Sequence, residues 1–180
     1  MKLWTDTYLN QLKELHGRKD RPRGFGGKIK PLGLFNSFMD QWKPKSALDY
    51  GCGKGTILQH LQMSYKNTIW EGYDPAVKKY SKLNNKTYDV VFSNDVLEHI
   101  EPDYVDLVLK HIDSLTNKYI WLRIDTEPAR KILKDGRNAH ISLNDANWWS
   151  KQVYHNINAR VLYMNLTKGK LDIALTKDIL

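Results

Sequence analysis

Cysteine, long apolar runs and acidic residues are scarce in this chain of 180 residues. Its single cysteine, Cys52, excludes a disulfide framework and a zinc site built from several cysteines. No apolar run is long enough to span a membrane. The first residues, MKLWTDTYLNQLKEL, lack the uncharged apolar core of a signal peptide. We therefore expect a cytoplasmic protein with no membrane partner.

Acidic residues are outnumbered, because 28 lysines and arginines stand against 20 aspartates and glutamates and give a formal net charge of +8. Part of this excess lies in one glycine-rich stretch, at Arg18, Lys19, Arg21, Arg23, Lys28 and Lys30. Clustered basic residues indicate a polyanionic partner. A lysine-rich composition also serves simply to keep a small protein in solution. Composition alone leaves both interpretations open.

The chain shows no internal repeat and no low-complexity tract. With 41% hydrophobic and 27% charged residues, its composition is that of one globular domain with a sizeable core. We expect a single domain over 1–180, with N-terminal helices and a possible lid at 1–42 and the core at 43–180. The basic stretch HGRKDRPRGFGGKIKP is either a solvated linker or a mobile flap over a ligand site.

The most informative stretch, Ala47 to Leu58, reads ALDYGCGKGTIL. It predicts the end of a buried strand, a turn with glycines at 51, 53 and 55, and a helix that opens at Thr56. Such glycines let the backbone approach a ligand, and the helix start offers unpaired N–H groups. A second acid, Asp74, ends another predicted strand nineteen residues after Gly55, close to where dinucleotide-binding folds place the acid that binds ribose hydroxyls. The stretch predicts a nucleotide-type site, although its spacing is neither that of a P-loop nor GxGxxG.

Apolar periodicity predicts that helices and strands alternate. Helices are expected at 3–15, 32–42 and 55–63, from Pro102 onward, and after a capping-box spacing at 142–145. Parallel strands are expected at 45–50, 68–73, 88–93 and 118–125, and an antiparallel hairpin at 159–166 and 170–176. This is the pattern of an α/β doubly wound fold with an antiparallel edge. Residues 75–87 are too few for a helix, a strand and a return loop, so we expect the usual third strand to be missing or reduced.

Several of these stretches resemble one family. D-x-G-C-G-x-G at 49–55 resembles motif I of the class I S-adenosylmethionine-dependent methyltransferases, and GYDP at 72–75 resembles their acidic motif. YDVVFSNDVLEHI resembles the type 11 subgroup, and the closing hairpin resembles the reversed last strand of the family. With DVLEHIEPD, and DGRNAH followed by WW, the chain is similar to small methyltransferases of bacteriophages and prophages. The resemblance implies a Rossmann-like fold, methyltransferase activity, and S-adenosylmethionine as the cofactor with S-adenosylhomocysteine as the product.

By this resemblance the cofactor lies at the carboxyl ends of the parallel strands, where such sheets bind ligands. The glycine turn would hold its methionine part, and Asp74 would bind the ribose hydroxyls. The implied cofactor residues are Asp49, Gly51, Cys52, Gly53, Asp74, Pro75, Ser93, Asn94, Asp95 and Val96. Among them, Ser93, Asn94 and Asp95 would lie near the transferring methyl group. No acid stands between Asp74 and Asp89, so no residue is named for adenine.

Methyl transfer needs an acceptor atom held in line with the methyl, and a general base only if the acceptor must lose a proton early. His140 and Asn138, in the polar run DGRNAH, are predicted catalytic residues. His99 is a third, either as a base or as a residue that orients the following helix. The spacing of Glu98 and His99 from His140 fits no common metal-binding pattern, so we expect no metal.

Other residues are assigned to the substrate or to a lid: Tyr8, His16, Phe25, Gly26, Arg137 and Trp148. His16 ends a predicted helix, where a cation suits the helix dipole, while the resemblance implies that it faces the site. Trp148 could stack on a planar substrate. Trp149 is expected in the core, and Asp145 is expected to cap a helix.

These observations predict methyl transfer from S-adenosylmethionine to an unidentified acceptor, with a small molecule, a nucleotide or a modified base favoured and RNA possible. SNDV stands where DNA amino-methyltransferases carry a Pro-Pro-Tyr/Phe run, which disfavours DNA. Two alternatives stay open. One is a protein that binds or degrades the cofactor without methyl transfer, and the other is a basic nucleic-acid-binding module with an inherited fold.

Overall fold

The computed structural model describes residues 2–17 and 33–178. Its helices are α1 (Asp6–Gly17), α2 (Gly33–Trp42), α3 (Thr56–Ser64), α4 (Val105–Leu115) and α5 (Ala146–Asn156). Its strands are β1 (Ser46–Tyr50), β2 (Ile69–Tyr73), β3 (Tyr88–Asn94), β4 (Thr116–Asp125), β5 (Arg160–Thr167) and β6 (Lys170–Thr176). Short 3-10 helices lie at Lys78–Tyr80, Leu97–His99 and Pro102–Tyr104. No helix among the described residues has the length and apolar character needed to span a membrane.

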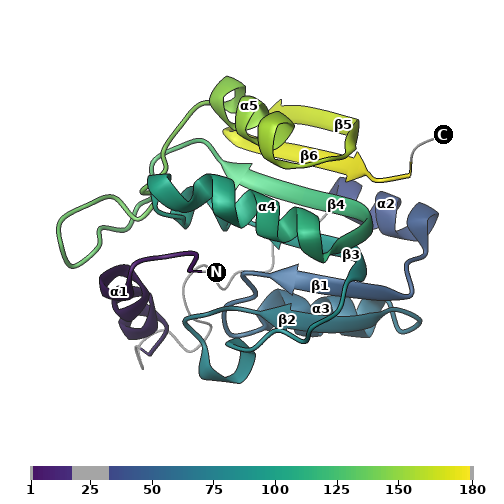
Figure 1. Cartoon of the computed structure of the whole chain (residues 1–180), viewed down its shortest axis with the longest axis horizontal. Helices are drawn as coiled ribbons and strands as arrows, with labels where there is room; N and C mark the ends of the chain where they lie inside the picture. Colours follow the sequence, from purple (N-terminus) through teal and green to yellow (C-terminus); the bar gives the residue numbers. More distant parts are fainter. Residues whose placement is uncertain (1, 18–32, 179–180) are drawn as a thin grey trace.

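The strands form one six-stranded sheet in the order β2-β1-β3-β4-β6-β5. β1, β2, β3 and β4 pair in parallel, while β6 runs antiparallel to both β4 and β5. The order reverses beside β1, because the chain moves first to β2 on one side and then to β3 on the other. Figure 1 shows α1 at the end of the sheet to which the arrows of β1 and β4 point. The sheet confirms the predicted doubly wound α/β fold with an antiparallel C-terminal hairpin.

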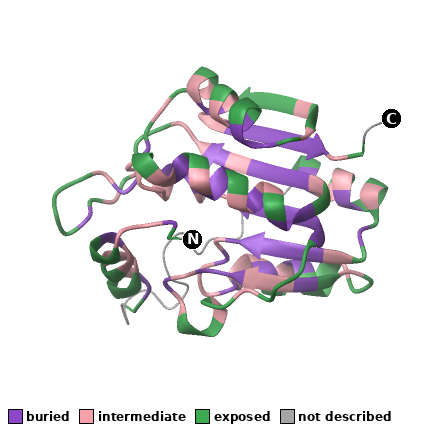
Figure 2. Ribbon diagram, viewed as in Figure 1, coloured by how far each residue is buried: buried purple, intermediate pink, exposed green. Residues whose placement is uncertain are grey.

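Helices cover both faces of the sheet, because successive strand residues point to opposite faces. Leu48 and Val91 face a core that also contains Val108 and Leu109 of α4 and residues of α5. The opposite face packs against α2 and α3 in a second core, whose buried members include Ala47, Val90, Phe92, Phe35 and Leu61. The inner strands are accordingly buried, whereas the edge strand β5 is largely exposed (Figure 2).

The segment between β2 and β3 contains a 3-10 helix and no strand. β2 is therefore an edge of the sheet, and the predicted loss of the third strand is confirmed. Asp74 N donates to Tyr80 O at 2.9 Å, which folds the short segment back against the end of β2. The shortened crossover leaves this edge without the strand that would extend the sheet beyond β2.

Two local predictions are wrong in detail. The capping box at 142–145 does not form: Asp145 is the N-cap of α5 and accepts from Trp148 N at 2.8 Å, as expected for Asp145. Ser142 instead donates its hydroxyl to Ile100 O at 2.6 Å. The first helix starts at Asp6 rather than at residue 3. The predicted flap, with Phe25, Gly26 and the basic cluster, lies outside the described residues.

Candidate active site

The glycine turn between β1 and α3 is held against the end of β2. Gly51 N and Cys52 N both donate to Tyr73 O, at 2.7 and 3.1 Å. Gly51 has a φ of +82°, and a Cβ there would lie 2.4 Å from Cγ2 of Val96. Any side chain at position 51 would meet Val96, which lies two residues beyond the end of β3. The turn therefore requires glycine for its backbone angle and for its close approach to Val96.

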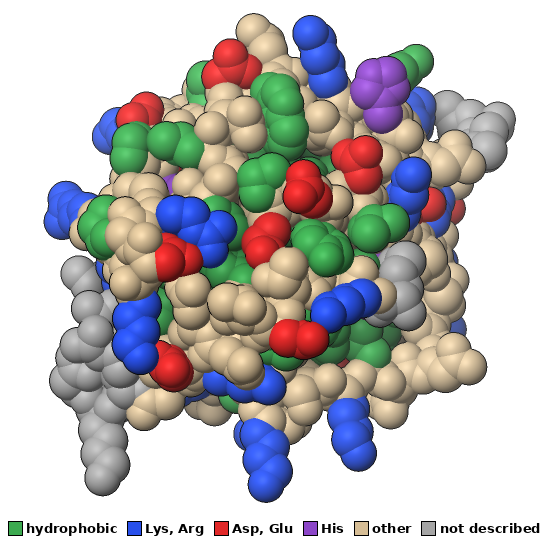
Figure 3. Space-filling model, turned by 60° about the vertical axis from the view of Figure 1, so that its left-hand side comes forward, with side chains coloured by type: hydrophobic (Ala, Val, Ile, Leu, Met, Phe, Trp, Pro, Cys, Tyr) green, Lys and Arg blue, Asp and Glu red, His purple; other side chains and the backbone are tan. Residues whose placement is uncertain are grey.

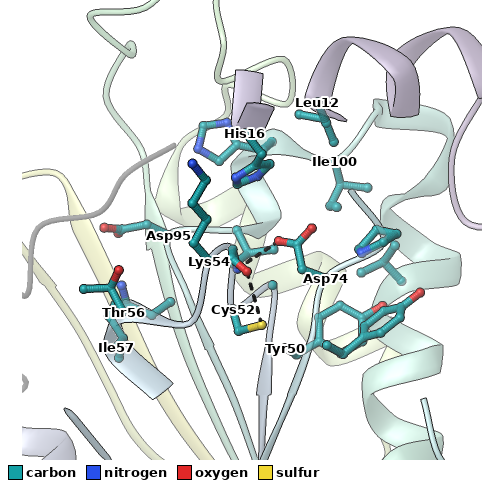
Figure 4. A pocket seen from close by; sticks show the side chains of 18 of the residues that line it. Leu12, His16, Tyr50, Cys52, Lys54, Thr56, Ile57, Asp74, Asp95 and Ile100 are labelled. Atoms are coloured by element: carbon teal, nitrogen blue, oxygen red, sulfur yellow. Dashed lines mark hydrogen bonds between the residues drawn. The ribbon is translucent and has the colours of Figure 1, made fainter. Parts of the chain in front are cut away.

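Asp74 is fixed at the carboxyl end of β2. Its Oδ2 accepts from Gly53 N at 2.9 Å, and its Oδ1 accepts from Ala76 N at 2.9 Å. The residue is buried. Figure 4 shows the carboxylate beside the glycine turn, with the bond to Gly53 drawn as a dashed line. An acid in this position can accept hydrogen bonds from paired hydroxyl groups of a ligand while the two amides hold its orientation.

A cavity joins this turn to the ends of β2 and β3 and to α1. Its predicted residues are Gly51, Cys52, Gly53, Asp74, Pro75, Asn94, Asp95, Val96, His16 and His99. The residues that sequence reasoning missed are Trp4, Leu12, Tyr50, Lys54, Thr56, Ile57, Tyr73, Ile100 and Val108. Most of them directly flank the motifs, and Leu12 lies one helical turn before His16, so helical spacing could have found it. The lining combines apolar walls with a few polar groups, as small-molecule sites do.

Two predicted cofactor residues, Asp49 and Ser93, do not line the cavity. Both are buried, and Asp49 Oδ2 and Ser93 Oγ have no hydrogen-bond partner among the described residues. Burial, reinforced by the charge of Asp74, raises the pKa of Asp49 to about 8. Burial also raises the pKa of the Cys52 thiol, whose Sγ lies 3.6 Å from Gly53 O. Cys52 thus keeps its thiol protonated, in agreement with its interpretation as a small filling residue rather than a nucleophile.

α1 forms one side of the cavity through contacts at its start. Thr5 donates its N–H and its hydroxyl to Glu101, at 2.7 and 2.8 Å. Tyr8 donates its hydroxyl to His99 O at 2.6 Å. Tyr8 does not line the cavity; it fastens the helix to the segment after β3. Leu12 and His16 follow on the same helix and do line it (Figure 4).

Three further predicted residues that line the cavity are ionisable: His16, His99 and Asp95. Burial lowers the pKa of His16, while the charge of Asp74 opposes that shift. Burial lowers the pKa of His99 to about 4, so its ring is neutral at pH 7. Asp95 has a φ of +54° and pairs with Lys170 at 3.1 Å. A non-glycine residue in this conformation is uncommon and is often found at functional sites.

The run DGRNAH is folded into a loop of its own. Asn138 Oδ1 accepts from Ala129 N at 3.0 Å and from His140 N at 2.9 Å, and its Nδ2 donates to Ala129 O at 2.9 Å. Arg137 pairs with Asp135 at 2.7 Å on the surface. Neither Arg137, Asn138 nor His140 lines the cavity. The amide of Asn138 is occupied in holding the loop, which leaves its predicted catalytic role without support from the geometry.

The two tryptophans of α5 pack on or in the hydrophobic core and do not line the cavity. Trp149 is fully buried, as expected. Trp148 is half-buried, packs against the same core and meets the ring of Trp149 edge-on at 4.9 Å. It does not line the cavity, so the structure does not place it for stacking on a cavity-bound substrate.

The face that includes the α1 side of the molecule has mixed charge. In Figure 3, acidic side chains lie among the lysines and arginines, and no continuous basic surface is seen there among the described residues. The basic cluster at 18–30 lies outside the described residues. This view therefore gives no support to a nucleic-acid-binding module.

The site combines three features: a glycine turn that leads into a helix, an acid at the end of the neighbouring parallel strand, and a cavity at the carboxyl edge of the sheet. Together they define a nucleotide-type cofactor site of the class I methyltransferase fold. A sequence model of the methyltransferase domain family matches residues 19–162. The chain therefore belongs to the methyltransferase domain family, and S-adenosylmethionine is the cofactor of that family. No curated protein matches the chain in sequence.

Solved structures share the fold at low identity. Magnesium protoporphyrin IX methyltransferase from Synechocystis, solved with bound S-adenosylmethionine, matches at a TM-score of 0.63 and 15% identity, over 99% of this chain and 100% of that one. An O-methyltransferase family protein from Burkholderia thailandensis matches at 0.61 and 13%, over 81% of this chain and 56% of that one. TehB from Haemophilus influenzae matches at 0.59 and 14%, over 93% and 67%. The chain thus spans little more than half of the Burkholderia protein.

Proposed function

We propose that this protein transfers the methyl group of S-adenosylmethionine to a small molecule, a nucleotide or a modified base. One observation carries the proposal: the Asp74 carboxylate is held by Gly53 N and Ala76 N at the wall of the cavity beside the glycine turn. This is the position from which an acid binds the two ribose hydroxyls of a nucleotide-type cofactor. The family match to residues 19–162 supports the same cofactor.

The cavity residues suit the parts of this cofactor. The glycine turn presents backbone rather than side chains to the cavity at positions 51 and 53, and the start of α3 presents N–H groups that favour a carboxylate. The apolar lining at Tyr50, Tyr73 and Val108 would exclude water from the bound cofactor. When bound, S-adenosylmethionine supplies an electrophilic methyl group on a sulfonium sulfur. The protein then acts chiefly by holding the acceptor atom in line with that methyl.

The acceptor would enter between α1 and the segment after β3, where His16, Asp95 and His99 line the cavity. A neutral His99 can accept a proton from an acceptor that must lose one. The names of the structural neighbours include a porphyrin methyltransferase and an O-methyltransferase, which supports a small-molecule acceptor. RNA is the second choice, and its only support is the basic cluster. The resemblance to phage enzymes and the cytoplasmic location are part of the same proposal.

Calorimetric titration with S-adenosylmethionine and S-adenosylhomocysteine tests the cofactor site. We expect both to bind, and Asp74→Asn to weaken binding at least about tenfold, because hydrogen bonds to a charged group contribute about 1.5–3 kcal/mol. Asn keeps an oxygen for one of the two amide contacts, so the fold should survive. Asp103→Asn, on an exposed residue, is the matched control. Unchanged affinity in Asp74→Asn would show that the ribose assignment is wrong.

Turnover is tested separately by incubation with labelled S-adenosylmethionine and a panel of nucleotides, RNA and small-molecule extracts. Label in an acceptor supports the enzyme. Cofactor binding without any transfer, or with breakdown of the cofactor alone, would favour a non-catalytic or cofactor-degrading protein. Tight, salt-sensitive nucleic-acid binding that persists in Asp74→Asn would favour the basic binding module.

A further inference from the structure

Glu98, His99 and His140 come together behind the wall of the cavity. Their potential ligand atoms all lie within 4.8 Å of one another. The rings of His99 and His140 meet edge-on with centroids 4.8 Å apart. The two histidines are forty-one residues apart in the sequence, so their linear spacing gave no metal-binding pattern. The fold creates the cluster.

Both histidines are anchored through the same ring nitrogen. His99 Nδ1 lies 2.6 Å from Ala139 O, and His140 Nδ1 lies 2.5 Å from Glu127 O. A carbonyl oxygen has no proton, so each Nδ1 is the donor. In a neutral ring this places the lone pair on Nε2. Metal-binding histidines are commonly oriented in this way, with one nitrogen donating to a backbone carbonyl and the other binding the cation.

Glu98 supplies a buried carboxyl group, whose hydrogen-bonding capacity the described residues do not fully satisfy. The side chain is fully buried, and Oε1 accepts from Asp125 N at 3.2 Å. Oε2 is buried and has no hydrogen-bond partner among the described residues. An unpaired buried carboxylate oxygen is costly. A cation at this point would give that oxygen a partner.

The two chain segments that carry the cluster are also fixed to each other. Ser142 N donates to Glu98 O at 3.1 Å, and Ser142 Oγ donates to Ile100 O at 2.6 Å. The His140 backbone is held by Asn138, whose Oδ1 accepts from His140 N. The loop formed by the run DGRNAH thus positions His140 beside Glu98 and His99.

We propose that Glu98, His99 and His140 form a binding site for a divalent transition-metal cation. Two imidazoles and one carboxylate suit zinc, iron, manganese or cobalt better than magnesium or calcium, which prefer oxygen ligands. Ligand atoms around one cation lie roughly 3–3.5 Å apart at the usual bond lengths of about 2.1 Å. Binding would draw the three side chains together and stabilise the folded protein. Three protein ligands also leave coordination positions for a further molecule.

Where the cation would act rests on the proposed function. His99 lines the cavity, so a cation bound to it would lie at the cavity wall and could bind an oxygen of the methyl acceptor. With Nε2 of His99 on the cation, His99 would no longer accept the acceptor's proton. Instead the cation would lower the pKa of an acceptor hydroxyl, whose proton leaves to solvent. The oxygen would then form a bond to the methyl carbon as the carbon–sulfur bond breaks, with its electron pair passing to sulfur to give S-adenosylhomocysteine. The site therefore favours an oxygen acceptor.

Metal titration of the chelator-treated, tag-free full chain tests the site. Cobalt is followed by its visible absorption and zinc by calorimetry. We expect one cation per chain and a rise in the unfolding temperature with zinc. His140→Gln and Glu98→Gln should each weaken cobalt and zinc binding at least about tenfold. His155→Gln, an exposed histidine on α5, is the matched control and should bind like the wild type.

The outcomes separate the metal site from the proposed function. Absence of cobalt and zinc uptake by the wild type overturns the site, as does equal binding by His140→Gln. Uptake that falls equally in His155→Gln shows adventitious binding and also overturns it. If the site variants fail to fold, the unfolding temperature of the wild type is the deciding measurement. An unfolding temperature that does not rise with zinc would then overturn the site. S-adenosylmethionine binding by the metal-free wild type tests the cofactor site by itself, so either proposal can fail while the other stands.

Discussion

Replacement of Gly51 by alanine should lower both the free energy of unfolding and the affinity for S-adenosylmethionine. The residue has a φ of +82°, and an added Cβ would lie 2.4 and 2.6 Å from the two γ-carbons of Val96. Two separate costs follow. A side chain at positive φ costs about 1–2 kcal/mol, and forcing a methyl group into packed surroundings costs about 1–3 kcal/mol more. We expect Gly51→Ala to lower the free energy of unfolding by about 2–5 kcal/mol.

The two costs can be measured separately. Gly136 also has a positive φ, of +85°, but an added Cβ there would meet nothing within 4 Å. Gly136→Ala should therefore show only the cost of the backbone angle. Val96→Ala removes both γ-carbons and leaves Cβ of Val96 at 3.1 Å from the added methyl. Gly51→Ala should cost less in the Val96→Ala background than in the wild type.

Urea unfolding followed by circular dichroism gives the four free energies of the double-mutant cycle. We expect a coupling of about 1–3 kcal/mol between positions 51 and 96. Zero coupling, or a loss in Gly51→Ala no larger than in Gly136→Ala, would refute the explanation by steric contact. Calorimetry on the same variants should show weaker S-adenosylmethionine binding in Gly51→Ala and unchanged binding in Gly136→Ala.

Two further predictions concern buried charge. Burial raises the folded-state pKa of Asp49 to about 8, whereas the pKa of an unfolded aspartate is about 3.9. Between these two values the folded protein keeps a proton that the unfolded chain releases. The free energy of unfolding therefore falls as the pH rises through this range. Asp49→Asn removes this loss, so the variant should become more stable relative to the wild type as the pH rises from about 5 to about 8, by at most about 1.4 kcal/mol per pH unit. Urea unfolding at several pH values checks this. A difference in the free energy of unfolding that does not change with pH would contradict the prediction. Asp172 holds Arg123 through bonds of 2.6 and 2.7 Å between β6 and β4, with both side chains largely buried, so Asp172→Ala should cost about 3–5 kcal/mol in urea unfolding. Asp6→Ala, which breaks an exposed pair with Lys2, should cost far less, because water screens exposed ion pairs. Equal losses in the two variants would disprove the role of burial.

Local sequence was sufficient for the elements whose shape depends on neighbouring residues. The turn at Gly51–Gly55 could be predicted because only glycine tolerates its backbone angles and close contacts. The lost third strand followed from chain length alone, since residues 75–87 cannot span a helix, a strand and a return loop. The antiparallel hairpin followed from two short strand-like runs at 159–166 and 170–176 that only a few residues separate. Most of the predicted cofactor residues line the cavity for the same reason: they end parallel strands at one edge of the sheet.

Only the tertiary structure decided which side chains share a site. Asn138 is polar and close in sequence to His140, yet its amide is occupied by backbone groups of Ala129 and His140. Glu98, His99 and His140 meet because Ser142 fastens two distant segments to each other. Contacts between residues so far apart in the sequence depend on the path of whole loops and on long-range hydrogen bonds, and no local sequence pattern encodes these. The sequence by itself determined the fold and the cofactor edge of the sheet, whereas the packing of α1 and of the loop after β4 decided what faces it.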